Sequence, residues 1–324
     1  MTRYYGVVSN RDYIKINGQK RPFWEFLDHE PEGWLCSLAY VRDDPPHHLP
    51  CLWDCGAWSY RDKEIPKIKR NLVTATWAFE QYTLLAQPGD LVVAPDHMLI
   101  PNTDHAARRR FNQESAAQFI AHTQGTGLIP MACIHGTTVD ERVTHARELC
   151  AMGYEHLALG GLAGRASQKR VVLEIVEHIR AAIPQDIWLH VLGLSAPFYY
   201  KEWLRLGINS CDGASQFKQA FSGTFYMVSD ADPTRLQSHK AVKPNERPTA
   251  PLCDCSACAT LRQHGIDTRT YGSNQHNMGR AAHNLTMLMR THHAIAHEHR
   301  QRPQLTQERM SFPMEPAELA VARP

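Results

Sequence analysis

Leu128-Ile-Pro-Met-Ala-Cys-Ile-His135 and His156-Leu-Ala-Leu-Gly-Gly161 are two short apolar runs, each ending in a polar or glycine residue. Between them, Thr138 and Asp140 are helix-start signals for residues 139–152, which have one apolar face at helical spacing. Near-continuous apolar strands are typical of parallel sheets that are buried on both faces. The stretch therefore predicts a strand, a helix and a second strand parallel to the first.

The same alternation of strand and helix runs through most of the chain. Strands are expected at residues 4–9, 35–40, 51–54, 91–96, 128–135, 156–161, 187–193 and 208–212. Helices are expected at residues 67–86, 106–123, 139–152, 168–182 and 197–206. Eight strands in this alternation favour an α/β protein with a (β/α)8 TIM barrel, and a doubly wound sheet is the alternative.

A cluster of thiols follows the last expected strand. Cys253-Asp-Cys255-Ser-Ala-Cys258 places three cysteines within six residues, and His283 follows after 24 intervening residues. A Cys3His set suits one structural zinc ion in tetrahedral geometry. Four protein ligands leave no open position, so the zinc would stabilise the fold rather than perform chemistry. The alternative is a chance group of cysteines with a helical histidine.

The alternation of strand and helix ends after Asp212, and composition divides the rest of the chain. We expect a barrel catalytic core at residues 1–224 and an inserted or C-terminal zinc-binding subdomain at residues 225–299, ending in a helix at residues 279–299. The histidines at positions 292, 293, 297 and 299 are expected on the surface of that helix. Residues 300–324 carry four prolines and no apolar face, which favours a disordered tail.

Composition excludes several classes of protein. The chain has 324 residues, a hydrophobic fraction of 43% and a formal net charge of +2, so it has a sizeable core but no overall polyanion-binding charge. Nine cysteines, an odd number in a chain of this length, do not form a secreted disulfide framework and favour a reducing cytoplasm. No apolar leader follows Met1 and no run reaches membrane-spanning length, so a membrane protein is not expected.

Polar and glycine residues stand where the expected strands end. These positions are Asp54, Asp96, His135, Gly160-Gly161, His190 and Asp212. The carboxyl ends of TIM-barrel strands converge on one pocket, so these residues are candidates for one active site. Two carboxylates in one pocket indicate chemistry at an anomeric carbon, where one attacks the sugar and the other moves a proton. The alternative for each aspartate is a helix N-cap.

Five short motifs together resemble the tRNA-guanine transglycosylase family, including its archaeosine and DNA-modifying branches, over residues 50–290. The motifs are the three cysteines with His283-Asn284-Leu285, Gly153-Tyr-Glu-His-Leu-Ala-Leu-Gly160-Gly161-Leu162-Ala163-Gly164, Trp53-Asp54-Cys55-Gly56-Ala57-Trp58, Ala94-Pro95-Asp96-His97 and Gly207-Ile208-Asn-Ser-Cys211-Asp212. Each motif is short, and the resemblance rests on all five in the family's order at the expected strand ends.

The resemblance implies a role for each matching residue. It implies that Asp212 attacks C1′ of the target nucleotide and expels guanine, after which an incoming 7-deazaguanine displaces the enzyme with retention of configuration. Asp54 resembles the general acid/base, and Asp96 resembles the residue that reads the guanine-like edge. Gly160 and Gly161 would present backbone amides to the carbonyl edge of the base.

Several pocket positions depart from the family's pattern. His135 stands where the family usually has glutamine, and a ring N–H could still donate to the base oxygen. Trp58 replaces phenylalanine and either stacks on a flipped nucleotide or fills the core. Ala57 replaces a glycine and His97 an acidic residue. These changes imply that the incoming base and the polymer differ from those of the bacterial tRNA enzyme.

We expect the polymer to be DNA, with tRNA as the alternative. The chain is shorter than typical tRNA-modifying members, and no appended RNA-binding domain is visible. Arg108, Arg109 and Arg110 are candidates for phosphate contacts, or form a solvated helix face. The expected reaction replaces guanine in DNA by a 7-deazaguanine (preQ0-like) base in a bacterial or phage-infected cell, and the partners are a second copy of the chain or a protein that opens duplex DNA.

Two other classes of protein are open to the same sequence. One is a non-catalytic, zinc-containing subunit that binds nucleic acid. The other is a barrel metallohydrolase with a second, catalytic metal, whose ligands would be Asp96, His97, His135 and His190.

Overall fold

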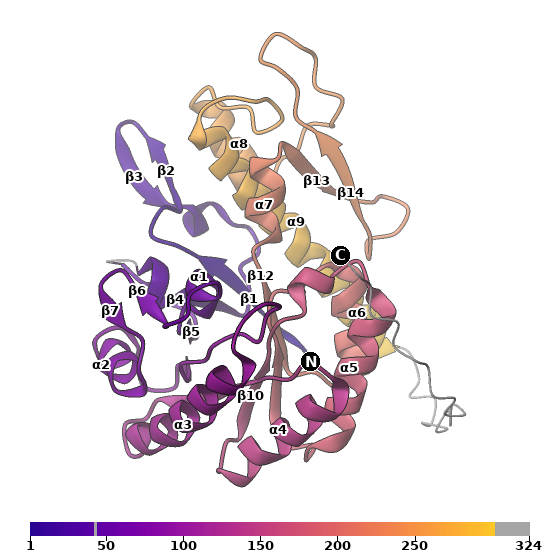
Figure 1. Ribbon diagram of the computed structural model, residues 1–324. Helices are drawn as coiled ribbons and strands as arrows, with labels where there is room; N and C mark the ends of the chain where they lie inside the picture. Colours follow the sequence, from indigo (N-terminus) through magenta and orange to yellow (C-terminus); the bar gives the residue numbers. More distant parts are fainter. Residues whose placement is uncertain (42–43, 302–324) are drawn as a thin grey trace.

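Eight parallel strands close into a barrel in the computed structural model, which describes residues 1–41 and 44–301 (Figure 1). Around the barrel the order is β1, β12, β11, β10, β9, β8, β5, β4. The strands are β1 (Arg3–Val8), β4 (Gly33–Ser37), β5 (Cys51–Asp54), β8 (Leu91–Val93), β9 (Ile129–Ile134), β10 (His156–Leu159), β11 (Trp188–Val191) and β12 (Ser210–Gly213). The eight strands expected from the sequence are therefore confirmed, and the doubly wound sheet is excluded.

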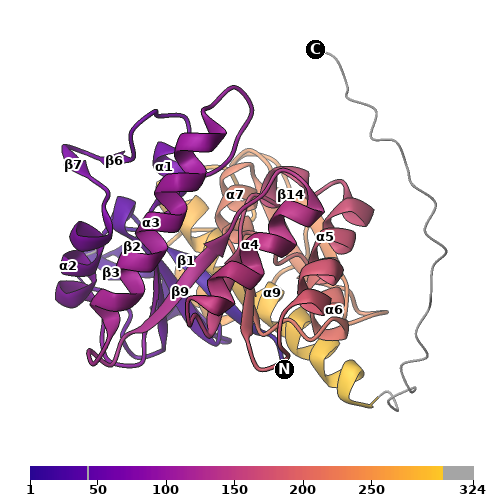
Figure 2. The same cartoon turned by 60° about the horizontal axis from the view of Figure 1, so that its bottom comes forward.

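Amphipathic helices cover the outside of one half of the barrel, where they follow one another in Figures 1 and 2. They are α2 (Ala75–Leu85), α3 (His105–Thr123), α4 (Val139–Ala151), α5 (Lys169–Ala182) and α6 (Pro197–Arg205). Helix α5 shows why they form, because Val172, Ile175, Val176 and Ile179 recur at helical spacing and are buried. At the start of α4, the Thr138 hydroxyl and the Glu141 carboxylate make a reciprocal capping box.

The helix expected at residues 67–86 is wrong over residues 67–74. Residues Lys67–Ile68 (β6) and Asn71–Leu72 (β7) instead form a short antiparallel hairpin, whose turn includes Lys69 at a φ of +54°. The helix α2 begins only after Thr74, whose hydroxyl accepts a hydrogen bond from the Trp77 amide.

The first connections of the barrel contain little α-helix. A hairpin of β2 (Tyr13–Ile16) and β3 (Gln19–Pro22), the short helical turns η1 (Phe23–Phe26) and η2 (Leu38–Tyr40), and the four-residue helix α1 (Ala57–Tyr60) occupy that region, and η3 (Ala163–Arg165) follows β10. The last helix, α9 (Asn274–Gln301), fills part of the gap, because it packs against α6 and α7 (Ser215–Phe221) and also against β2 and η1. It therefore belongs to the shell of the barrel as well as to the C-terminal region.

The C-terminal region is built around α9. A hairpin of β13 (Thr224–Val228) and β14 (Leu236–Lys240) packs on α9, and so does α8 (Ser256–Gln263). No periodicity in the sequence predicted this hairpin. His292 was expected on the surface but is fully buried, with its ring stacked on Tyr200 at 3.9 Å; His293, His297 and His299 are exposed.

Residues 300 and 301 continue α9, and the remainder of the tail expected at residues 300–324 lies outside the described residues. Within the described part of the chain, no helix is long and apolar enough to cross a membrane.

Candidate active site and zinc centre

Six neighbouring strands bring the predicted residues to one end of the barrel. Asp54 ends β5, Asp96 follows β8, His135 follows β9, Gly160 follows β10, His190 lies near the end of β11 and Asp212 lies near the end of β12. These are the carboxyl ends of the strands, where barrel enzymes place their catalytic groups. The three aspartates are close enough that the charges of Asp96 and Asp212 both act on Asp54.

Asp54 favours its protonated form. Its carboxylate accepts hydrogen bonds from the Ser37 hydroxyl at 3.2 Å and from the Gly56 amide at 2.9 Å. Burial of the carboxyl group, and then the negative charge of Asp96, outweigh those bonds and raise the pKa of Asp54 to about 7. Gly56 has a φ of +88°, which favours glycine and turns its amide back toward Asp54. Asp54 is thus suited to exchange a proton near neutral pH.

Asp96 is buried and lies between the Cys55 thiol and the His135 ring, which come from neighbouring strands. Its Oδ1 lies 3.1 Å from the thiol of Cys55, and its Oδ2 lies 3.0 Å from Nε2 of His135. The backbone amide of His135 donates to Nδ1 of His145, and burial lowers the pKa of His145 to about 4, so that ring is neutral and can accept. The sequence predicted Asp96 and His135 but did not indicate that they contact each other.

Asp212 is held through one of its two oxygens. Nε2 of His190 lies 3.1 Å from Oδ1, and the Gly193 amide donates to the same oxygen at 2.8 Å. For the part of the chain that the structure describes, no hydrogen bond reaches Oδ2. On the neighbouring strand β1, Tyr4 points outward, because its ring contacts His292 of α9. Successive side chains of a strand alternate in direction, so Tyr5 points into the barrel. Asp212 is the register partner of Tyr5 and therefore also faces the inside.

The four predicted zinc ligands lie together at the base of the C-terminal region. Cys253 and Cys255 precede α8, Cys258 lies on α8 and His283 lies on α9. Their ligand atoms are all within 4.8 Å of one another, and Nδ1 of His283 lies 3.3 Å from the sulfur of Cys255 and 3.4 Å from that of Cys258. Zinc–sulfur bonds of about 2.3 Å and a zinc–nitrogen bond of about 2.0 Å in tetrahedral geometry place nitrogen and sulfur about 3.5 Å apart, so the spacing suits this ion.

The groups around the cluster also fit a metal. Nε2 of His283 faces the Tyr226 carbonyl, so Nε2 carries the proton and the bare Nδ1 faces the thiols. The ring of Phe225 stacks on His283 with centroids 3.8 Å apart and fixes its plane. Hydrogen bonds from the thiols of Cys255 and Cys258 lower the pKa of Cys253. The hydrogen bond between Cys255 and Cys253 raises the pKa of Cys255 to about 12. A divalent cation would let all three thiols ionise, and with four protein ligands it would hold α8, α9 and β13 together rather than supply catalysis.

Comparison with known proteins agrees with this arrangement. Residues 90–301, more than half of the chain, match the family described as Queuine tRNA-ribosyltransferase. This protein belongs to that family. The matched stretch begins just before β8 and includes Asp96, His135, Asp212 and the four zinc ligands.

Individual relatives of the queuine tRNA-ribosyltransferase family are distant. A DNA-guanine transglycosylase from Salmonella montevideo is 23% identical over 195 residues, which are 57% of this chain and 46% of the relative. A queuine tRNA-ribosyltransferase from Pseudomonas putida is 23% identical over 180 residues, which are 56% of this chain and 45% of the relative. Another from Vibrio parahaemolyticus is 28% identical over 123 residues, 38% of this chain and 32% of the relative. The chain spans about half the length of the curated relatives that it matches.

Two further pocket groups take definite places in this family member. Trp58, on α1, has 57% of its surface exposed and stacks on the Arg61 guanidinium at 4.2 Å, so it does not fill the core. Gly160 accepts a hydrogen bond from Arg142 at 3.0 Å, and Gly161 is exposed with a φ of +75°. The exposed glycine leaves the backbone accessible to a flat ligand.

The three consecutive arginines of α3 divide into two kinds. Arg108 is buried and donates to the carbonyl oxygens of residues 61, 63 and 98, so its assignment as a phosphate contact is wrong. Arg109 pairs with Glu141 at 2.8 Å, and Arg110 is exposed. Only Arg109 and Arg110 remain candidates for phosphate.

The metallohydrolase alternative finds no support among the described residues. Asp96, His97, His135 and His190 do not form a group with ligand atoms within 4.8 Å of one another. The sequence analysis missed a second such group, His47, Cys51 and Asp90, but the oxygens of Asp90 already accept hydrogen bonds from the Cys51 and Gln87 amides and from the Trp53 indole. Asp90 therefore has a structural role, because it joins β5 to the segment that precedes β8.

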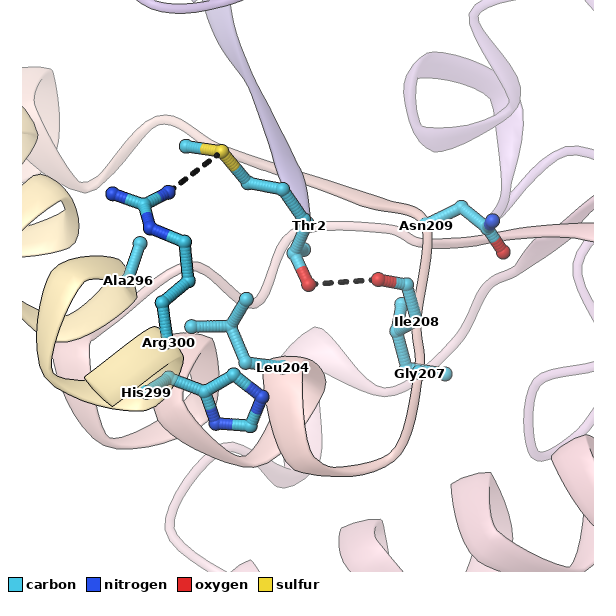
Figure 3. Close-up of a pocket in the computed structure, with 9 residues that line it drawn as sticks. Thr2, Leu204, Gly207, Ile208, Asn209, Ala296, His299 and Arg300 are labelled. Carbon is cyan, nitrogen blue, oxygen red and sulfur yellow. Dashed lines mark hydrogen bonds between the residues drawn. The ribbon is translucent and has the colours of Figure 1, made fainter. Parts of the chain in front are cut away.

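A pocket of about 220 Å³ lies at the amino-terminal ends of β1 and β12, the end of the barrel opposite the aspartates. Figure 3 shows the residues that line it. It is lined by Thr2, which precedes β1, by Asn209, which precedes β12, and by Arg300 near the end of α9. The amino-terminal ends of barrel strands serve stability rather than catalysis, so we do not place a substrate there.

Proposed function

We propose that this protein is a transglycosylase that replaces guanine in nucleic acid, with DNA as the favoured polymer, by a 7-deazaguanine base. The observation that carries the proposal is the contrast between two carboxyl groups at one end of the barrel. Asp54 has a pKa raised to about 7, whereas Asp212 is fixed through Oδ1 by two donors. Carboxyl groups in such different environments are suited to different roles in one reaction.

In the first proposed step, Oδ2 of Asp212 attacks C1′ of the target nucleotide. A bond forms between that oxygen and C1′, and the glycosidic bond breaks with its electron pair moving to guanine. The carboxyl proton of Asp54 passes to the departing base, which leaves as neutral guanine. The product is an ester between Asp212 and the sugar.

In the second proposed step, the ring nitrogen of the incoming 7-deazaguanine attacks C1′ from the face that guanine left. The bond to Asp212 breaks and restores its carboxylate, while Asp54 takes up the N–H proton of the incoming base. Two displacements at one carbon retain its configuration. Asp54 ends the cycle protonated, as it began.

The remaining pocket residues suit a planar base. The carboxylate of Asp96 can accept the N1–H and the exocyclic N–H of a guanine-like edge, and Nε2 of His135, which lies against Asp96, can turn its proton to the base oxygen. Trp58 is exposed at the same end of the barrel, where it can stack on an extruded base. The backbone near Gly160 and Gly161 would face the carbonyl edge.

The names of two relatives bear on the choice of polymer, one for each candidate. The relative from Salmonella montevideo, whose match covers 57% of the chain, bears the name DNA-guanine transglycosylase. The tRNA alternative has the support of the Pseudomonas putida relative, whose match covers 56%. We also propose that residues 1–224 form the catalytic core and that the residues from 225 onward, including α9, form the structural zinc region.

Base exchange tests the proposal directly. Purified protein is incubated with radiolabelled guanine and, in parallel, with tRNA, single-stranded DNA and duplex DNA, and Asp212→Asn is the control. We expect label in DNA with the unchanged protein and none with the variant. Label in tRNA alone would show that the substrate is tRNA rather than DNA. Equal labelling by Asp212→Asn would refute the assignment of Asp212 as the nucleophile. The same assay with 7-deazaguanine bases as competitors identifies the base that displaces the label.

A further inference from the structure

We propose that His190 is a positioning residue that holds the nucleophilic carboxylate of Asp212, and that Ser210 and Trp188 fix the tautomer in which it does so. This inference rests on the proposed function of Asp212. His190 lies on β11 beside β12, where its register partner is Ser210. It is fully buried, so its ring nitrogens depend on protein partners.

A chain of hydrogen bonds runs from one end of the barrel toward the other through His190. The Trp188 indole donates to the Ser210 hydroxyl at 2.8 Å, and that hydroxyl lies 2.8 Å from Nδ1 of His190. Nε2 of His190 lies 3.1 Å from Oδ1 of Asp212. Residues 188 and 190 are two positions apart on β11, and residues 210 and 212 are two positions apart on β12. Side chains two positions apart share one face of a strand, so all four face the inside of the barrel.

The direction of each bond follows from the first donor. An indole N–H can only donate, so Ser210 accepts from Trp188 and its own hydroxyl proton is free to point at Nδ1 of His190. With Nδ1 accepting, the ring proton resides on Nε2 and is donated to Asp212. The opposite tautomer would place a ring lone pair against the carboxylate.

This arrangement connects His190 to the direction in which Asp212 attacks. The His190 ring and the Gly193 amide both hold Oδ1, so Oδ2 keeps a fixed direction for attack at C1′. The edge of the Tyr5 ring contacts His190, with centroids 6.0 Å apart, and limits rotation of the imidazole. Loss of the donor should therefore slow the chemical step and leave polymer binding almost unchanged.

Variants of His190 separate positioning from packing. His190→Leu removes the donor, whereas His190→Gln keeps an N–H group near the position of Nε2. We expect His190→Leu to lower kcat by about 10–100-fold with KM changed less than about threefold, and His190→Gln to recover most of that loss. Ser210→Ala should lower kcat as well, because it removes the hydroxyl that keeps the ring proton of His190 on Nε2. The matched control is His292→Gln, since His292 is equally buried but its Nε2 contacts the Ser195 carbonyl.

The tautomer is measured without turnover, so failure of this inference is distinguishable from failure of the proposed function. Protein labelled with ¹⁵N-histidine is compared with His190→Gln to assign the His190 signals. We expect a proton on Nε2, which Ser210→Ala perturbs. Absence of a proton on Nε2 overturns the inference whether or not the protein exchanges bases. In an active protein, equal kcat for His190→Leu and the unchanged chain, or equal loss in the Leu and Gln variants, overturns it as well.

Discussion

At the scale of single residues, the site depends on a carboxyl group whose pKa is raised by folding. Asp54 accepts two hydrogen bonds, yet burial and the charge of Asp96 raise its pKa to about 7. An unfolded aspartate titrates near pH 4. Between these two values the folded protein keeps a proton that the unfolded chain has released, so this residue makes stability fall as pH rises through that window.

Replacement of Asp54 should therefore stabilise the protein while inactivating it. A full shift of this size corresponds to about 4 kcal/mol, and partial access of Asp54 to solvent reduces the expected gain to about 1–2 kcal/mol. We expect Asp54→Asn to raise the free energy of unfolding at pH 8, to have little effect at pH 4, and to abolish base exchange. Urea unfolding at both pH values measures the difference. Asp62→Asn, an exposed aspartate, is the control; the same gain in that variant, or no gain at pH 8 in Asp54→Asn, would contradict the account.

Sequence position predicted which residues reach the site but not how they pair. Asp54, Asp96 and Asp212 were predictable because each ends an apolar run, and the end of a run is the end of a strand. The bond between His190 and Asp212 depends on the register between β11 and β12, which the sequence does not encode locally. Tertiary packing sets such pairs.

At the scale of elements, α3 shows how one helix separates adjacent arginines. Its buried positions include Arg108, Asn112, Ser115, Ala116 and Phe119, a helical spacing that places Arg108 on the inner face. Because Arg108, Asn112 and Ser115 are polar, hydrophobicity along the sequence does not mark this face as the inner one. Arg110 lies two residues further along, on the exposed face.

Substitution of each arginine should have a different consequence. Arg108→Ala leaves three carbonyl groups without their donor, and we expect it to lower the free energy of unfolding by about 2–3 kcal/mol. Arg110→Ala should leave stability unchanged and reduce the slope of log affinity for nucleic acid against log salt concentration by about 1. Thermal unfolding and binding titrations at several salt concentrations measure the two effects. An unchanged salt slope in Arg110→Ala would remove that residue from the phosphate contacts.

The start of the helix expected at residues 67–86 was misplaced because the local sequence gives a weak turn signal there. The apolar positions of this stretch do not show where the helix begins, whereas the hairpin of β6 and β7 turns at Lys69, a non-glycine residue in the left-handed region. Such a turn has a weak signature when glycine and asparagine are absent from it. The Thr74 cap was the available signal for the true start.

At the scale of the whole molecule, α9 connects the candidate metal site of three cysteines and His283 to the barrel. His283 lies in its first half, and further along the helix His292 contacts Tyr200 of α6 and the Ser195 carbonyl. The sequence predicted the metal ligands because their spacing is local, whereas the contacts of α9 with α6, α7 and β2 join distant parts of the chain. Loss of the metal should therefore lower the stability of the barrel as well as that of the C-terminal region.

Removal of zinc should destabilise the entire protein. We expect a strong chelator to lower Tm by about 10 °C or more, because structural zinc contributes several kcal/mol of folding free energy, and to expose the region from residue 225 to proteolysis. Cys255→Ser should reproduce the effect, whereas Cys150→Ser, a half-buried cysteine outside the cluster, should not. Unchanged unfolding of the metal-free protein would contradict a structural role for the ion.

The proposed mechanism requires Asp212 to form a bond to the sugar of the target nucleotide. The most direct test is to mix the protein with guanine-containing DNA, denature it rapidly, digest both polymers and search for the ester by mass spectrometry. We predict a nucleotide adduct on the peptide that contains Asp212, absent from Asp212→Asn and lost when free guanine is added in excess before denaturation. Base exchange that proceeds with an adduct on another residue, or through Asp212→Asn, would contradict the account.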